Sequence, residues 1–436
     1  MQSLWQATET LPHFPKLSGN KKTSVLIIGG GIAGVLTAYF LHQHKVPYIL
    51  VEKDEICGKT TGHTTAKLTL QHGLIYYKLI EQYGMEKARM YYQTNLRALN
   101  QYKKLCQNID CDFEKKDNYV YVTDNTQNGI EKIENEARAL ELLGQKSFLE
   151  DKLNIPVKVT GAVCCPEQAQ FHPLKFLRAI SENLNIYEHT FAKEMIGTKC
   201  ITDDGCIEAE KVIAATHFPF INKHGSYFIK MYQHRSYVLA LSDAPDIDGM
   251  YVDADKKGMS FRNYNGMILL GGGGHRTGKP GGNWSELRHF AKTYYPDAKE
   301  EYAWAAQDCI TLDDIPYIGN YSAKTPNLYV ATGFNKWGMT GAMSAAMLLT
   351  DKILGKNKLI LNVFSPSRSI LKPRLFTNAL EAAANLITPS SKRCPHLGCA
   401  LKWNPAEHSW DCPCHGSRFT KDGKVLDNPA NGDMKR

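Results

Sequence analysis

The stretch that decides the fold reads Val25-Leu26-Ile27-Ile28-Gly29-Gly30-Gly31-Ile32-Ala33-Gly34, an apolar run followed by the glycine pattern G-x-G-x-x-G. Residues 25–28 have the composition of a buried strand, and residues 32–43 have that of a helix. A second apolar run, residues 48–51, ends at Glu52. This order predicts a βαβ unit of the kind that binds a dinucleotide.

Each part of this fingerprint has a physical task. Gly29 permits the tight turn, Gly31 lets a pyrophosphate approach the backbone, and Gly34 lets helix and strand pack closely. The free N–H groups at the start of the helix, at Ile32 and Ala33, are expected to bind phosphates. Glu52 is expected to accept hydrogen bonds from ribose hydroxyls. The alternative is a glycine-rich turn without a ligand. Residues 271–274 are also glycine-rich, but no helical pattern follows them, so only one nucleotide site is predicted.

The composition is that of an ordinary globular protein. The chain has 436 residues, 43% hydrophobic and 22% charged, and a mean hydropathy of −0.36. These values exclude disordered, collagen-like, coiled-coil and multispan membrane proteins, and the length predicts two or three domains. Residues 25–41 carry no charge, but their four glycines favour the strand-turn-helix over a membrane span. Residues 1–15 lack the basic start and cleavage site of a signal peptide, so we expect a cytoplasmic protein without a transmembrane segment.

The net charge of +8 is concentrated near the C-terminus, where residues 356–436 contain 13 Lys and Arg against 6 Asp and Glu. A solvated basic surface and a docking face for an acidic partner both explain this excess. No nucleic-acid-binding motif accompanies the charge, so nucleic acid is not an expected partner.

Further along the chain, the pattern predicts helices over residues 76–145, with a strand near 119–122, and a helix over 173–183. Strands are expected at 186–191, 199–202 and 211–215, and residues 230–310 are predicted to be β-rich, most clearly at 237–241 and 267–270. A strand at 328–331 precedes a long apolar helix at 339–354. Residues 364–390 are interpreted as a connector to a compact Cys/His module at 391–436.

Three motifs beyond the fingerprint carry a family resemblance. They are Gly58-Lys59-Thr60-Thr61-Gly62-His63-Thr64-Thr65-Ala66-Lys67, Asp313-Asp314-Ile315-Pro316-Tyr317-Ile318-Gly319, and Ala331-Thr332-Gly333-Phe334 with Gly338-Met339-Thr340-Gly341 opening a helix. Over residues 20–355 the chain resembles the D-amino-acid oxidase and glycine/sarcosine oxidase superfamily of FAD enzymes. The resemblance implies an α/β (α+β overall) fold, in which a Rossmann-like FAD domain is interleaved with a β-rich substrate domain.

The resemblance also implies domain boundaries and a site. It assigns residues 1–75, 150–225 and 311–355 to the FAD domain, 76–149 and 226–310 to the substrate domain, and 356–390 to a linker. Non-covalent FAD is then expected to contact the fingerprint residues and also Lys53, Thr64, Thr65, Ala66, Gly333, Gly338, Met339 and Thr340.

The substrate side departs from the relatives. Thr340 stands where amine-oxidising relatives have a lysine that binds the substrate carboxylate, which argues against a simple amino acid as substrate. Arg235, Arg262, Arg276 and Lys336 are candidates for an anionic substrate or, alternatively, for structural ion pairs. We identify no catalytic residue from the sequence.

Four of the 12 cysteines fall within 21 residues near the C-terminus, in Cys394-Pro395-His396-Leu397-Gly398-Cys399 and Cys412-Pro413-Cys414-His415-Gly416-Ser417. Such clustering in a reducing compartment favours a metal site. The spacing resembles that of Rieske [2Fe–2S] modules. The resemblance implies that Cys394 and Cys412 bind one iron, that His396 and His415 bind the other, and that Cys399 and Cys414 form a disulfide. A Cys2His2 zinc site and a pure disulfide staple are the alternatives.

This module is shorter than a full Rieske domain, so we expect its stability to depend on contacts with the flavin domain. An FAD domain with a C-terminal Rieske module resembles a group of bacterial oxidoreductases. We therefore expect a dehydrogenase that oxidises a small substrate, at an amine or amino-acid-like C–N bond, and passes electrons from FAD to the cluster and on to an external one-electron acceptor, a protein or a quinone. An O2-using oxidase with a structural Rieske module and a non-enzymatic electron carrier or redox sensor are the alternatives.

Overall fold

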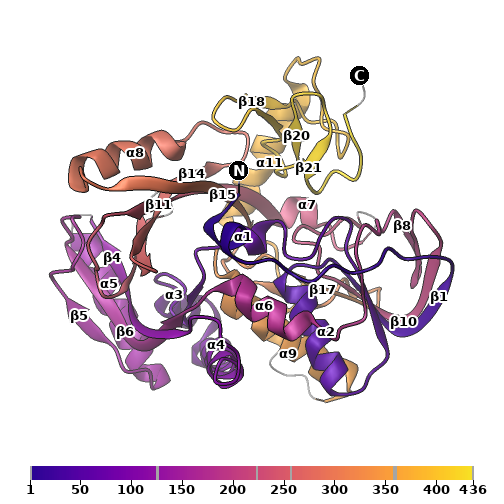
Figure 1. Ribbon diagram of the computed structural model, residues 1–436, viewed down its shortest axis with the longest axis horizontal. Coiled ribbons are helices and arrows are strands. Elements are labelled where there is room, and N and C mark those ends of the chain that lie inside the picture. The colour runs from indigo at the N-terminus through magenta and orange to yellow at the C-terminus, as the bar shows by residue number, and fades with distance from the viewer. Residues whose placement is uncertain (1, 124–126, 222–223, 256–257, 357–360, 435–436) are drawn as a thin grey trace.

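The computed structural model describes residues 2–123, 127–221, 224–255, 258–356 and 361–434. These residues form an eight-stranded sheet, a nine-stranded sheet and a four-stranded sheet (Figure 1). The first two sheets draw strands from widely separated parts of the chain, whereas the third is formed near the C-terminus alone.

The eight-stranded sheet has a parallel centre that positions the fingerprint turn. Its order is β16-β17-β10-β1-β2-β7, and the register sets Ile28 opposite both Val51 and Ala214. Since these parallel strands end together, Gly29 and Glu52 leave the same edge of the sheet, where α/β proteins bind their ligands. The strands are β1 (Lys21–Ile28), β2 (Tyr48–Val51), β7 (Ile186–Tyr187), β8 (Glu194–Ile196), β9 (Lys199–Ile201), β10 (Cys206–Ala214), β16 (Tyr317–Asn320) and β17 (Leu328–Thr332).

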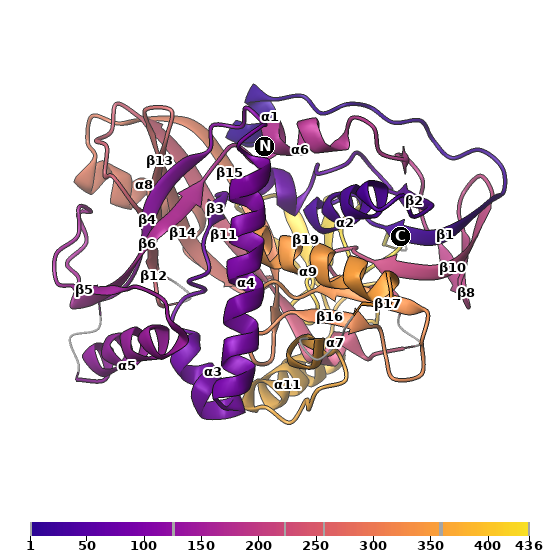
Figure 2. The ribbon, with the colours of Figure 1, turned by 90° about the horizontal axis from the view of Figure 1, so that it is seen from below.

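Two apolar helices, α2 (Ile32–Gln43) and α9 (Gly338–Ile353), pack side by side against one face of this sheet (Figure 2). Both are buried on nearly all sides, as their uniformly apolar sequences predict. The short helix α1 (Leu4–Thr8) is capped by Ser3, and its Trp5 donates from Nε1 to the Thr64 carbonyl at 2.7 Å. The N-terminal segment thereby packs against a wall of the site.

The nine-stranded sheet has the order β15-β11-β14-β13-β12-β4-β6-β3, with β5 beside β6. β12 and β4 pair in parallel and join two antiparallel halves. Helix α8 lies along β14 and β11. The strands are β3 (Lys67–Leu68), β4 (Glu114–Val122), β5 (Phe148–Glu150), β6 (Gly161–Gln170), β11 (Met231–Ser242), β12 (Met250–Asp253), β13 (Ser260–Tyr264), β14 (Met267–Arg276) and β15 (Lys299–Thr311). The helices are η1 (Thr60–His63), α3 (Tyr76–Tyr83), α4 (Met85–Leu105), α5 (Gln127–Leu143), α6 (Pro173–Ser181) and α8 (Asn283–Tyr294).

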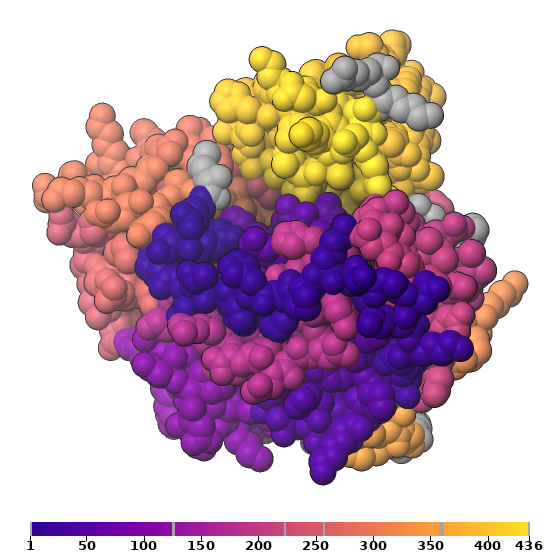
Figure 3. Space-filling view, turned by 45° about the vertical axis from the view of Figure 1, so that its right-hand side comes forward, coloured from indigo at the N-terminus to yellow at the C-terminus, as the bar shows by residue number. Residues whose placement is uncertain are grey.

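The C-terminal part forms a small module that rests on the remainder of the molecule (Figure 3). Its antiparallel sheet consists of β18 (Lys402–Asn404), β19 (Ser409–Asp411), β20 (Arg418–Thr420) and β21 (Val425–Asp427). The helices that lead to it are α7 (Tyr227–Lys230), α10 (Leu361–Phe364) and α11 (Pro373–Ile387).

The predicted fold class is confirmed, but two details differ. The predicted boundaries assign β3 and β6 to the FAD domain, whereas both strands pair in the nine-stranded sheet, because a strand pattern does not specify its pairing partner. The predicted connector contains the fifteen-residue helix α11. Its large apolar residues recur at helical spacing, which is the usual signal of an amphipathic helix, but they are exposed.

Candidate functional site

One cavity of about 750 Å³ reaches all three sheets. Its wall includes the fingerprint turn, residues 57–65, parts of β11 and β14, and the first turn of α9. Residues of the small module, Val425 to Asn428 and Ala430 to Asp433, complete the wall. The site predicted for the nucleotide and the C-terminal module therefore share one space.

The fingerprint turn has the geometry that its glycines predict. Gly29 has φ +109°, and a Cβ there would lie 2.6 Å from the Ala215 carbonyl oxygen. A Cβ on Gly34 would lie 1.9 Å from the Gly29 carbonyl oxygen, which is the close packing of α2 on β1. Around Gly31 the nearest atom to such a Cβ is Thr61 Oγ1 at 3.5 Å, so the backbone there is open to the cavity. This cradle fits a pyrophosphate at the N-terminus of α2. The Ile32 N–H, predicted to be free, instead donates to Thr61 Oγ1 at 3.0 Å.

Glu52 lies at the end of β2 and lines the cavity. Its carboxylate accepts from the Gly30 N–H at 2.6 Å and from the Asp54 N–H at 3.0 Å. Burial raises the pKa of Glu52, while these two N–H groups act in the opposite direction. The residue is thus fixed against the fingerprint turn, where a ribose of a bound dinucleotide is expected.

The other predicted contact residues divide into two groups. The first group lines the cavity and consists of Gly29, Gly31, Ile32, Ala33, Glu52, Lys53, Thr64, Thr65, Gly338 and Met339. The second group does not line it and consists of Gly34, Ala66, Gly333 and Thr340. The Thr340 hydroxyl donates to the Thr69 carbonyl at 3.0 Å and lies 2.8 Å from His72 Nε2. It is held in the core of the protein, away from the space in which a substrate would bind.

The structure gives named partners for the three arginine candidates. Arg235 forms a buried ion pair with Glu407, Arg262 donates to the carbonyls of Thr65 and Ala66, and Arg276 donates to carbonyls of the small module. Lys336 lines the cavity. The alternative of a structural ion pair holds for Arg235, whereas Arg262 and Arg276 are held by backbone carbonyls.

Lys67 lines the cavity and was not among the predicted contacts. It is buried, and its Nζ lies 3.3 Å from Thr65 Oγ1. Burial, together with the nearby charge of Arg262, lowers the pKa of Lys67 to about 7. Its position at the end of the 58–67 motif was the available signal.

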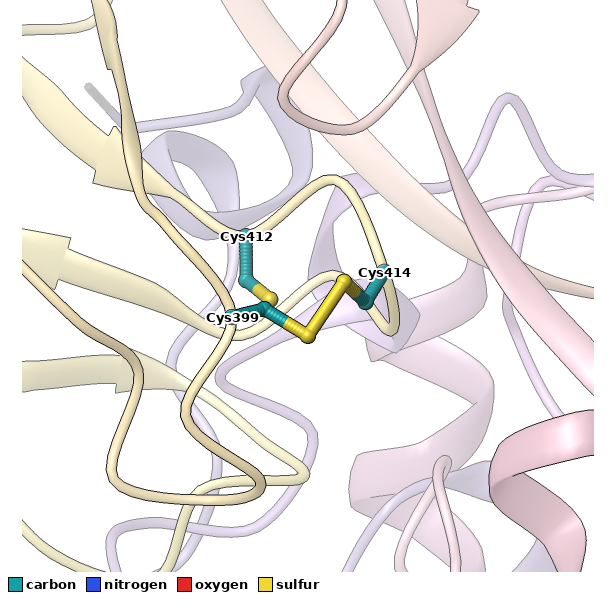
Figure 4. A group of neighbouring side chains, drawn as sticks. All are labelled: Cys399, Cys412 and Cys414. Carbon is teal, nitrogen blue, oxygen red and sulfur yellow. A yellow bond between two sulfur atoms is a disulfide. The ribbon is translucent and has the colours of Figure 1, made fainter. Parts of the chain in front are cut away.

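Two loops with the same hydrogen bonds present the clustered cysteines and histidines. In the first loop, the Cys394 N–H donates to the Cys399 carbonyl and the Gly398 N–H donates to the Cys394 carbonyl, both at 2.9 Å. In the second, Cys412 donates to Ser417 and Gly416 donates to Cys412, also at 2.9 Å. A disulfide between Cys399 and Cys414 joins the loops, as the resemblance implied (Figure 4).

The four predicted ligands lie on these two loops as two pairs, one of cysteines and one of histidines. The buried thiols of Cys394 and Cys412 are hydrogen-bond partners, and this contact is the main cause that lowers the pKa of Cys394, to about 7. The rings of His396 and His415 lie 5.0 Å apart at 89°. His415 Nδ1 is buried without a hydrogen-bond partner among the described residues. Two facing thiols and an imidazole nitrogen left open fit the two-sulfur, two-nitrogen donor set of a Rieske cluster.

A different trio of sulfurs also lies close together. Those of Cys399, Cys412 and Cys414 lie within 4.8 Å of one another (Figure 4). Because two of them form the disulfide, only Cys412 in this trio can supply a thiolate. The trio therefore does not replace the predicted ligand set.

The second loop is attached to the nine-stranded sheet. Gln233 and Gln307 donate from Nε2 to the His415 and Gly416 carbonyls, each at 2.9 Å. Arg276 donates to the Pro413 carbonyl at 2.9 Å and to the Cys414 carbonyl at 3.0 Å. Gln233 and Gln307 were not predicted, and Arg276 was predicted only as a candidate for substrate or an ion pair, because this role depends on a contact between distant segments.

A flavin-type dinucleotide cradle on an α/β fold and a Cys2His2 module on the same cavity define a two-centre redox protein. Comparison with known families agrees. Residues 24–352 match the DAO family of FAD dependent oxidoreductases, and residues 382–436 match the Rieske [2Fe-2S] domain. The chain belongs to the DAO family of FAD dependent oxidoreductases and carries a C-terminal Rieske domain. It is an oxidoreductase whose cofactors are FAD and a [2Fe–2S] cluster.

One relative matches the chain over its whole length, and another matches a short segment of it. The Bacillus subtilis (strain 168) protein YhfW, named for a Rieske 2Fe-2S iron-sulfur centre, is 34% identical over 100% of this chain and 97% of its own. The cytochrome b6-f complex iron-sulfur subunit 3 of Nostoc sp. is 54% identical over 37 residues, which are 8% of this chain and 21% of that subunit.

Solved structures share the fold of the larger part. The glycine oxidase of Geobacillus kaustophilus matches with a TM-score of 0.66 at 18% identity, over 80% of this chain and 99% of that chain. The L-proline dehydrogenase of P. horikoshii matches with a TM-score of 0.67 at 18% identity, over 80% and 98%. Among the described residues, the structure contains no helix with the length and apolar character needed to cross a membrane.

Proposed function

We propose that this protein is a dehydrogenase that removes electrons from a small substrate and delivers them to the Rieske cluster and then to an external one-electron acceptor. The observation that carries the proposal is the shared cavity. Residues of the module, Val425 to Asn428, form part of the wall that also contains the fingerprint turn. Bound FAD supplies a two-electron acceptor and the cluster supplies a one-electron carrier.

The residues of the chain have separate tasks in this proposal. The turn at Gly29 and Gly31 and the N-terminus of α2 bind the FAD phosphates, and Glu52 binds a ribose. Cys394 and Cys412 bind one iron, while His396 and His415 bind the other. Gln233 and Gln307 fix the second ligand loop, because both donate to its carbonyls from the nine-stranded sheet.

The packing around His415 supports transfer within one molecule. The rings of Phe218 and Phe228 lie edge-on to the imidazole, with centroids at 6.5 Å and 6.1 Å. Asn428 donates to the carbonyls of Thr216 and Phe218 at 2.6 Å and 2.9 Å. The module is thus bonded to the strand-end segment beside Gly29, so no separate docking step is needed to bring it to the flavin side.

We propose a substrate with an amine or amino-acid-like C–N bond. The family, and the glycine oxidase and L-proline dehydrogenase folds that the chain resembles, support this class. The side chains of Thr340 and of the three arginines are engaged by other groups of the protein and not by the cavity. This supports a substrate other than a simple amino acid. The cytoplasmic location stays a prediction.

The test is an anaerobic screen of amines, amino acids and hydroxy acids for bleaching of the flavin absorbance. A substrate that bleaches the flavin and also reduces the cluster supports the proposal. Stoichiometric hydrogen peroxide in air, with the cluster unchanged, would instead support an oxidase with a structural module. If no compound bleaches the flavin, an electron carrier or redox sensor is favoured.

A further inference from the structure

Helix α11 has its polarity reversed relative to an ordinary surface helix. Its inward side contains the buried amides of Asn378 and Asn385. Asn378 Oδ1 accepts from Arg276 at 2.8 Å, and the Asn385 carbonyl accepts from the Ala400 N–H at 2.9 Å. Polar groups thus hold the helix to the protein, in the position where a helix normally places its apolar residues.

The outward side is apolar. Phe376, Leu380 and Ile387 are 68%, 72% and 82% exposed, and Leu371, just before the helix, is 77% exposed. Positions 376, 380 and 387 recur at helical spacing, so they form one ridge along about 16 Å of the helix. Figure 2 shows α11 at the outer edge of the molecule, close to α7, with which it is in contact. Contiguous exposed apolar side chains are typical of interaction sites.

The charge beside the ridge is positive. Between residues 361 and 406, Glu381 is the only acidic residue, and it pairs with Lys279 at 2.7 Å. Lys392 and Lys402 are exposed, and neither forms an ion pair within the described ranges. Arg393 lies at the C-terminal end of α11, where it donates to the carbonyls of Leu386 and Thr388.

We propose that α11 binds the surface of an anionic lipid membrane, with Phe376, Leu380, Ile387 and Leu371 inserted and the basic residues at the headgroups. A convex ridge needs a complementary groove on a protein partner, whereas a bilayer interface accepts it without one. Apolar insertion combined with Lys and Arg at the headgroup level is the pattern of helices that lie in the plane of a membrane.

The ridge adjoins the first ligand loop of the module. Arg393 also donates to the Gly398 carbonyl at 2.7 Å, and the adjacent Leu397, next to His396, is 43% exposed. A membrane against α11 therefore brings this loop to the lipid surface. With the proposed function, this position makes a lipid-soluble quinone the acceptor class that fits. The membrane proposal itself does not depend on that step.

The test is co-sedimentation of the full-length protein, with both cofactors bound, with vesicles of phosphatidylglycerol and phosphatidylcholine or of phosphatidylcholine alone. We expect binding to the anionic vesicles, weaker binding at high salt, and at least a tenfold loss for the triple variant Phe376→Ser, Leu380→Ser, Ile387→Ser. Lys392→Gln with Lys402→Gln should lower the affinity for anionic vesicles only.

Ile196→Ser is the matched control, because Ile196 is 60% exposed on β8, far from α11 in the sequence. Unchanged flavin and cluster absorbance in every variant shows that each is folded. The proposal is wrong if the protein does not bind vesicles, or if the triple variant binds as well as the control. It is also wrong if the triple substitution instead converts a dimer to a monomer in sedimentation velocity, since the ridge then meets a second copy.

Discussion

At the scale of single residues, the geometry of the site depends on glycines, whose missing Cβ atoms allow close backbone contacts. Gly34 lacks a Cβ where one would lie 1.9 Å from the Gly29 carbonyl oxygen, and that closeness sets α2 on the edge of β1. The N-terminus of α2 reaches the cavity only because of this approach. We therefore expect Gly34 to contribute to FAD binding although it does not line the cavity.

Gly34→Ala should lower the free energy of unfolding by about 1–3 kcal/mol, the usual cost of overpacking a tight contact. It should also weaken FAD binding, because α2 must move away from β1. Gly161→Ala is the control, since a Cβ at that position would lie 3.8 Å from the nearest atom, Ile133 Cγ2. Urea unfolding and FAD titration measure both effects. Equal stability of the two variants would contradict the close packing described above.

Arg276 places a half-buried positive charge beside the second ligand loop, where it donates to the Pro413 and Cys414 carbonyls. Positive charge near a cluster favours its reduced form. Arg276→Gln should therefore lower the midpoint potential of the cluster, by on the order of tens of millivolts. Arg288→Gln removes an exposed charge on α8 and serves as the control. EPR-monitored redox titration is the measurement, and an unchanged potential in Arg276→Gln would contradict this role.

At the scale of elements, helix α3 is started by a side chain from another helix. Glu136 of α5 accepts from the N–H groups of Tyr76 and Tyr77 at 3.1 Å and 3.0 Å. Its burial raises the pKa from 4.5 to about 7. The native state therefore binds more protons than the unfolded state between these two values.

The free energy of unfolding should consequently fall as the pH rises from 4.5 to about 7. Glu136→Gln removes the titrating group. The free energy of unfolding of this variant, relative to that of the unmodified protein, should therefore rise by about 3 kcal/mol across this window. Glu134→Gln, at an exposed position of the same helix, should keep the original profile. Urea unfolding at several pH values measures this. A pH-independent difference would show that Glu136 does not change its protonation on unfolding.

The elements also show what the sequence can predict. The fingerprint, α2 and α9 were predictable because their signals are local: glycine spacing, a continuous apolar run and a start at the end of a strand. The contacts from Gln233, Gln307 and Arg276 were not, since they join segments more than 100 residues apart. Helix α11 was interpreted as a connector although Phe376, Leu380 and Ile387 recur at helical spacing; what the sequence does not show is that this apolar side is exposed.

At the scale of the whole molecule, a buried charge network holds the small module in place. Glu407 pairs with Arg235 of the nine-stranded sheet and with Arg418 of the module, and it accepts from the Tyr237 hydroxyl at 3.0 Å. All three charged side chains of this network are less than a tenth exposed. Removal of the Glu407 carboxylate takes one ion-pair partner away from each of two buried guanidinium groups, those of Arg235 and Arg418.

Glu407→Ala should therefore destabilise the attachment of the module by about 3–5 kcal/mol. Glu300→Ala, which breaks the more exposed pair with Arg288, should cost about 1 kcal/mol or less. Limited proteolysis measures the difference, and the first cleavages in Glu407→Ala are expected between residues 361 and 401. Equal protease resistance of the two variants would contradict a structural role for the network.

The most direct test of the central claim is photoreduction of the bound FAD under anaerobic conditions, with the cluster followed by EPR. We expect a Rieske signal to grow as electrons leave the flavin, at a rate independent of protein concentration. His415→Ala should abolish the signal and leave the flavin reduced. A cluster that stays oxidised beside reduced flavin, or a rate that rises with protein concentration, would contradict electron transfer within one molecule.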